Sequence, residues 1–177
     1  MEANRRGADR GFTLVGLLIV VAVIGLASVA TATVNSLAQR RLSEEQLLYV
    51  GEQYRHAIQL YYEATLPGQS HYPRQLADLL KDPRFVQTRR HIRELYVDPM
   101  TGRDDWKVVI APEGGIMGVR SISQQQPIKL AHFSPPFEAF ARRRAYAEWP
   151  FYFSGGGPLP EELRIWGLPQ EAPLAPE

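Results

Sequence analysis

The run of residues from Phe12 to Val34 constrains this chain most, because it holds no ionisable side chain and is rich in Leu, Ile and Val. The next charged residue is Arg40. Crossing the apolar core of a bilayer, about 30 Å thick, takes roughly 20 residues of helix. A helix that is apolar on every face needs lipid or protein around it. The run therefore predicts a transmembrane helix at residues 12–34, with a buried core helix of a soluble protein as the alternative.

Three arginines, Arg5, Arg6 and Arg10, precede this run. Basic residues on that side predict a cytoplasmic N-terminus and export of the rest of the chain. A secretory signal peptide also begins with basic residues, but its apolar stretch is shorter and ends at a small-residue cleavage site. Residues 27–30 offer such a site, yet the run continues past them, and Gly11 lies before the run instead. A simple signal anchor stays open as an alternative.

The junction at residues 10–15, with the sequence RGFTLV, resembles the class III leader junction of type IV pilins and of type II secretion pseudopilins. The resemblance implies that prepilin peptidase removes the basic leader 1–11 by cutting between Gly11 and Phe12, and that Phe12 is then N-methylated. It also implies a single-pass inner-membrane protein with a periplasmic C-terminal domain. Its partners would be the peptidase, other pilin-like subunits and an inner-membrane assembly platform.

The chain departs from the family at Gly16, where most members carry a glutamate that is thought to pair with the N-terminal amine of a neighbouring subunit. Glycine lacks that carboxylate and weakens a helix by about 1 kcal/mol relative to alanine. Gly16 thus marks an atypical assembly position. It indicates either a special place in a filament, such as the tip, or a weaker assembly step, and sequence drift or error is the remaining reading.

Beyond the apolar run, residues 35–62 predict an amphipathic continuation of the same helix. Its apolar stripe consists of Leu47, Val50, Tyr54, Ile58 and Tyr61. Residues 66–68 end the helix, and a globular pilin-like domain is expected at 63–153. Residues 154–177, rich in Pro and Gly, predict a flexible tail.

Within the domain, we expect a short helix at 75–80, a helical turn at 89–95 and a tight turn at 98–102. Strands are expected at 106–110 and 116–122. The predicted fold class is α+β, with a long N-terminal helix packed on a small domain of short helices and an antiparallel sheet.

This order is similar to the layout of the major pseudopilins over residues 11–123. The most specific positions are the pairs Tyr72-Pro73 and Asp98-Pro99. From Gln124 onward the likeness fails, because the acidic loop that binds calcium in that family is replaced by QQQPIK. Calcium needs six to eight oxygen ligands. No cofactor or metal is therefore expected, and a calcium site at Asp98, Thr101, Asp104 and Asp105 is the weaker alternative.

Residues 133–153 are aromatic and basic and predict a helix at 136–147 and a strand at 149–153. They suit either a partner-docking patch, since Arg and aromatic residues anchor interfaces, or a core of aromatics beside a solvated Arg face. We favour the core.

The remaining residues indicate no catalysis. The four histidines lack the spacing of metal ligands, and no nucleophile elbow or phosphate loop is present. Twenty basic and 19 acidic residues give no sign of a nucleic-acid partner. We therefore expect a structural subunit of a secretion pseudopilus or a type IV pilus rather than an enzyme. The absence of cysteine favours the pseudopilus weakly. The alternative is a signal-anchored periplasmic binding domain that does not polymerise.

Overall fold

The computed structural model describes the backbone of residues 8–168 and the side chains of residues 14–24 and 36–168. These residues form helices and a three-stranded antiparallel sheet, so the predicted α+β class is confirmed. Most of the predicted leader (1–7) and the end of the predicted tail (169–177) lie outside the described residues. The chain divides into two compact units, Met1–Leu42 and Ser43–Glu177.

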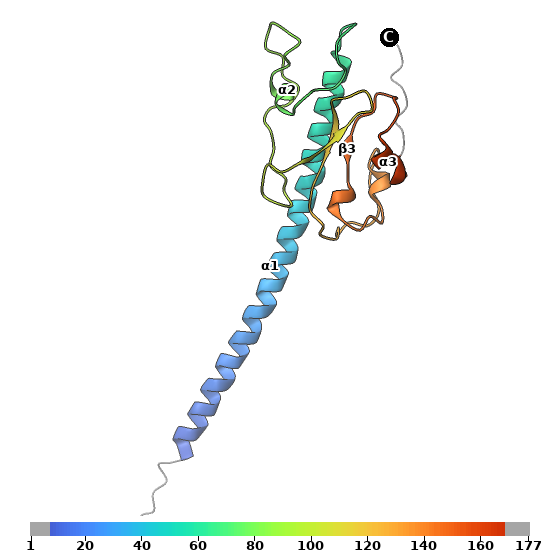
Figure 1. Cartoon of the computed structure of the whole chain (residues 1–177). Coiled ribbons are helices and arrows are strands. Elements are labelled where there is room, and N and C mark those ends of the chain that lie inside the picture. Colours follow the sequence, from blue (N-terminus) through green and yellow to red (C-terminus); the bar gives the residue numbers. More distant parts are fainter. Residues whose placement is uncertain (1–7, 169–177) are drawn as a thin grey trace, which may run out of the picture. The chain divides into compact units, whose positions relative to one another are not determined.

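Helix α1 spans Ala8–Glu63, which confirms one long helix over the predicted range 12–62 (Figure 1). After Glu63 the chain turns, and Gly68 adopts a left-handed conformation (φ 85°) that side chains with a Cβ rarely take. In the part of the chain that the structure describes, no helix is both long and apolar enough to cross a membrane. The side chains of residues 25–35, in the second half of the predicted span, lie outside the description.

The second unit contains a sheet of order β1-β2-β3, formed by Lys107–Ile110, Ile116–Arg120 and Phe151–Tyr152. All pairs are antiparallel, with Val108 opposite Val119 and Gly118 opposite Tyr152. The first two strands confirm the predicted hairpin, whose second strand ends at Arg120. The third is shorter than the predicted strand 149–153. Gly118 allows this close pairing, because a Cβ there would lie 2.6 Å from the carbonyl oxygen of Phe151.

The core of this unit lies between α1 and the sheet. The predicted apolar stripe of α1 is buried, since Leu47, Tyr54 and Ile58 have no exposed area. Gly51 lets the helix approach the sheet, because a Cβ on it would lie 2.3 Å from the ring of Phe151. A cluster of aromatic rings continues the core: Phe133, Phe137, Phe140, Tyr146, Trp149 and Phe151. The prediction that the aromatic residues of segment 133–153 form part of the core is thus confirmed.

Two predicted helices do not form. Residues 89–95 contain no helix, because the amides of His91 and Ile92 donate to the Leu79 carbonyl at the end of α2 (Ala77–Leu80). Residues 136–147 form only two short 3-10 helices, η1 (Glu138–Phe140) and η2 (Tyr146–Glu148). Arg142 lies between them at a φ of 61°, which a continuous helix excludes.

The predicted flexible tail is wrong for residues 154–168. This segment contains α3 (Glu161–Ile165), shown beside the sheet in Figure 1, and its leucines are buried: Leu159, Leu163 and Leu168. Arg120 on β2 reaches Glu162 at 2.5 Å and holds α3 in place. The prediction of a flexible tail relied on the abundance of Pro and Gly, and it overlooked three leucines whose side chains pack in the core. The part of α1 from Ser43 onward belongs to the same unit as this segment.

Candidate functional site

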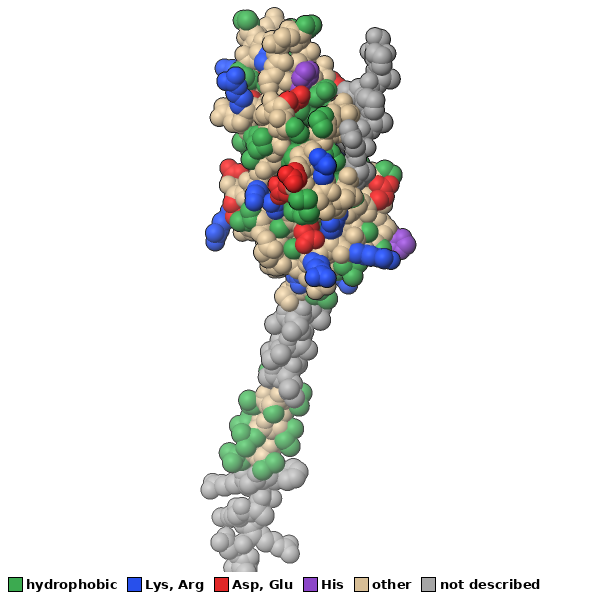
Figure 2. All heavy atoms as spheres, turned by 45° about the vertical axis from the view of Figure 1, so that its right-hand side comes forward, with side chains coloured by type: hydrophobic (Ala, Val, Ile, Leu, Met, Phe, Trp, Pro, Cys, Tyr) green, Lys and Arg blue, Asp and Glu red, His purple; other side chains and the backbone are tan. Residues whose placement is uncertain are grey.

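The most unusual surface in the described part of the chain is the stretch of α1 from Leu14 to Ile24. Its Leu, Val and Ile side chains are 53–62% exposed on every side of the helix. Figure 2 shows these hydrophobic side chains surrounding the described stretch of helix. Contiguous apolar surface of this kind marks an interaction with a membrane or with other proteins. The stretch is therefore a candidate surface for such an interaction.

The predicted processing residues lie at the start of the same helix. Gly11 and Phe12 are helical in backbone, because α1 begins at Ala8, while their side chains lie outside the described residues. Gly16 has open space around it, since nothing lies within 4 Å of a Cβ placed there. The absence of a glutamate at this position therefore has no steric cause within the chain.

Comparison with protein families supports the reading of this junction. Residues 6–32 match the sequence model of the prokaryotic N-terminal methylation motif. This motif is the hallmark of type IV pilin-like and pseudopilin proteins, so the chain carries the N-terminal signature of that group. The motif implies processing by prepilin peptidase and assembly with pilin-like subunits. Neither a curated protein nor a solved structure matches the chain.

Tyr72 and Pro73, the first pair of the pseudopilin-like pattern, tie the loop after α1 to the sheet. The Tyr72 hydroxyl donates to the carbonyl oxygen of Phe153 at 3.2 Å. The Pro73 carbonyl accepts from the amide of Ile116, at the start of β2, at 2.8 Å. Both residues are buried. They therefore fix the position of this loop against β2 and the segment after β3.

Asp98 and Pro99, the second pair, organise the tight turn that was predicted at 98–102. The Asp98 carboxylate has no exposed area, and it accepts from the Met100 amide at 2.8 Å and the Ser121 hydroxyl at 2.6 Å. These bonds engage both carboxylate oxygens of Asp98. Across residues 14–24 and 36–168, no three His, Asp or Glu side chains gather to hold a metal.

Glu44 takes on a role that the sequence did not reveal. Its carboxylate is 5% exposed and accepts from the amides of Ile128 (2.7 Å) and Lys129 (3.0 Å) and from the Tyr146 hydroxyl (2.8 Å). The loop that follows Gln124 has no acidic residue of its own, and the Glu44 carboxylate on α1 holds it in place. The placement of Glu44 within one helical turn of Leu47 and Leu48 was the available sign that it faces the domain.

A second group of charged side chains, also missed, fixes the base of the loop after α2. The Asp82 carboxylate accepts from Arg84 at 2.7 Å and lies 3.0 Å from His91 Nε2. The Arg84 guanidinium lies 3.6 Å from the centre of the Tyr61 ring and also donates to the Thr65 hydroxyl at 2.7 Å. Hydrogen bonds from Arg84 and His91 lower the pKa of Asp82 against the opposing effect of burial, and burial lowers the pKa of His91.

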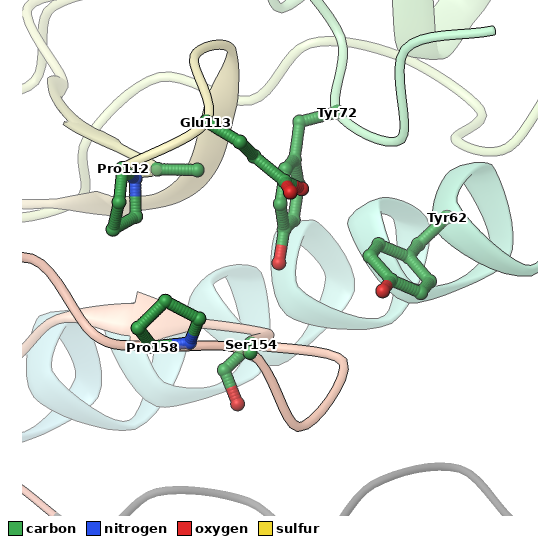
Figure 3. A pocket seen from close by; sticks show the side chains of 8 residues that line it. Tyr62, Tyr72, Pro112, Glu113, Ser154 and Pro158 are labelled. Carbon is green, nitrogen blue, oxygen red and sulfur yellow. The ribbon is translucent and has the colours of Figure 1, made fainter. Parts of the chain in front are cut away.

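One pocket of about 300 Å³ opens between three loops of the second unit. Figure 3 shows Tyr62 reaching into it from α1, Pro112 and Glu113 from the β1–β2 turn, and Pro158 from the segment after β3. Tyr72 forms another wall. Burial raises the pKa of Tyr62, and the nearby Glu113 carboxylate adds to the rise. Aromatic and proline walls with a single carboxylate favour a ligand that is partly apolar and positively charged.

Proposed function

We propose that this protein is a pilin-like structural subunit of a type II secretion pseudopilus or a type IV pilus. In this proposal, prepilin peptidase cuts after Gly11 and methylates Phe12, and residues 12–34 hold the chain in the inner membrane until assembly. The domain after Ser43 is then periplasmic. The observation that carries the proposal is the methylation motif at residues 6–32 together with the exposed apolar surface of α1 behind it.

The physical basis for assembly is the transfer of one apolar surface between two environments. Moving the Leu14–Ile24 stretch from lipid into water would expose a large apolar area at about 25 cal/mol per Å². Packing the same side chains among neighbouring helices avoids that cost. The subunit then needs no chemistry of its own, and we propose that it is not an enzyme. The absence of cysteine favours the pseudopilus over the pilus.

The experiment that tests this proposal is cross-linking between α1 helices in cells that express prepilin peptidase. Two cysteines introduced on opposite faces of the helix within residues 14–24 should give oligomeric ladders in the processed chain, because each chain can then bond to two neighbours. The native chain has no cysteine to interfere. In the variant Gly16→Glu, cleavage should persist and the ladder should lengthen, since the new carboxylate can pair with the N-terminal amine of a neighbouring subunit. A strictly monomeric, unprocessed chain would contradict the proposal.

The alternative function is a signal-anchored periplasmic domain that binds a ligand and never polymerises. Two observations favour it. Gly16 lacks the carboxylate used in family assembly, and the pocket beside Tyr62 and Glu113 is large enough for a small ligand. The cross-linking experiment separates the two, because only the subunit gives ladders.

A further inference from the structure

The loop formed by residues 85–90, which we name the basic loop, displays an apolar side chain between cations. Val86 is fully exposed, more than any other large apolar side chain in residues 14–24 and 36–168. Arg89 and Arg90 are exposed beside it, and the Arg89 guanidinium lies 4.9 Å from the centre of the Phe85 ring. Arginine is enriched at protein interfaces, and a valine that is fully exposed beside it can bury its apolar surface when a partner binds.

The base of the basic loop is rigidly built, although the loop has no regular secondary structure. Asp82 is fully buried and bonded to Arg84 and His91, and its amide donates to the Arg89 carbonyl at 3.0 Å. These bonds close the loop on both sides. A loop that is already ordered loses little conformational entropy on binding, which favours docking.

The same unit carries a recess of complementary character, the pocket lined by Tyr62, Tyr72, Pro112, Glu113, Ser154 and Pro158. We name it the tyrosine recess. The Glu113 side chain is 55% exposed, and its ion pair with His71 is long, at 3.8 Å. The carboxylate thus faces solvent where an incoming arginine can reach it. The rings and prolines provide apolar walls for a side chain such as valine.

We propose that the basic loop of one copy docks into the tyrosine recess of a neighbouring copy. Val86 enters between the tyrosine and proline walls, and Arg89 pairs with Glu113. An apolar projection and a complementary pocket at different places on one molecule produce a heterologous contact, which propagates when the rotation does not close. The contact rests on the proposed function, since it describes how the domains of successive subunits meet.

Disulfide trapping in the full chain tests the contact, because the native sequence has no cysteine. Two differently tagged copies are expressed together with prepilin peptidase, one carrying Val86→Cys and the other Pro112→Cys. The control pair combines Val86→Cys with Arg164→Cys, an exposed position on α3. Docking raises the effective concentration of the two thiols, so the first pair should give about tenfold more mixed dimer than the control.

A charge exchange then tests the Arg89–Glu113 pairing. Adding Glu113→Arg to the Pro112→Cys copy should reduce the mixed dimer by about tenfold through like-charge repulsion, and adding Arg89→Glu to the other copy should restore it. Three results would overturn the proposal. The first is mixed dimer at the control level, the second is a Val86→Cys chain that is trapped only on a different protein, and the third is a lack of rescue by Arg89→Glu.

The mass of the same chains separates the two proposals. Chains cut after Gly11 that trap only at the control level overturn the docking contact and leave the proposed function standing. Chains that remain uncut overturn both, because the contact rests on subunit assembly.

Discussion

Two stretches of α1 show what surrounds an apolar helix in this protein. From Leu14 to Ile24 the aliphatic side chains are exposed all round, each by more than half. From Leu47 to Tyr61 one apolar stripe is buried, because the sheet and its aromatic cluster cover it. Its members are at most 2% exposed: Leu47, Val50, Tyr54, Ile58 and Tyr61. The second stretch already has its partner within the chain. The first exposes its aliphatic side chains on every side of the helix, which is the physical basis for the proposal that lipid and sister helices surround it.

The comparison predicts that the largest effect comes from a charge placed in the Leu14–Ile24 stretch, which should prevent its insertion into the membrane. In the variant Val23→Asp, an aspartate near the centre of an inserted helix costs about 3 kcal/mol, which shifts the insertion equilibrium roughly a hundredfold. Membrane fractionation should show loss of the chain from the membrane. Val97→Asp, at an exposed apolar position of the domain, is the matched control and should remain in the membrane. Equal retention of both variants would remove the distinction between the two stretches.

A matched pair of glycines on α1 sharpens the comparison. In Gly51→Ala the new methyl lies 2.3 Å from the Phe151 ring, which is locked in the core, so we expect a loss of about 2–3 kcal/mol. Gly16→Ala meets nothing within 4 Å, and it should leave the melting midpoint of the domain unchanged. Thermal unfolding of the two variants measures the difference. Equal midpoints would show that the Gly51 contact is not close.

The smallest expected effect concerns pH and is confined to the second unit. Burial lowers the pKa of His91 in the folded chain, so the unfolded chain binds its proton first, near pH 6.5. The unfolding free energy should therefore be constant above that pH and fall below it, by at most about 1.4 kcal/mol per pH unit. Urea unfolding of His91→Gln between pH 7.5 and 5 should show a flatter profile. An identical slope would exclude His91 as the titrating group.

The sequence predicted well wherever one local pattern decided the structure. The stripe from Leu47 to Tyr61 has helical spacing and is buried, and the two strands of the hairpin flank a glycine-containing turn. The methylation motif was readable for the same reason, since it is continuous in sequence.

Prediction failed where contacts distant in sequence decided the outcome. Residues 89–95 do not form a helix, because two of their amides donate to the Leu79 carbonyl. The positive φ of Arg142 interrupts the segment that was expected to be one helix. The Glu44 anchor joins residues more than 80 positions apart, and the tyrosine recess gathers three separate loops. The partners that meet in these contacts cannot be identified until the chain is folded.

The central claim is that the junction between Gly11 and Phe12 is processed, and the intact mass of the purified protein tests it most directly. Expressed with prepilin peptidase, the chain should have the mass of residues 12–177 plus one methyl group, about 14 Da, on the amine of Phe12. A chain that keeps Met1, or one that is cut at another bond, would contradict the account.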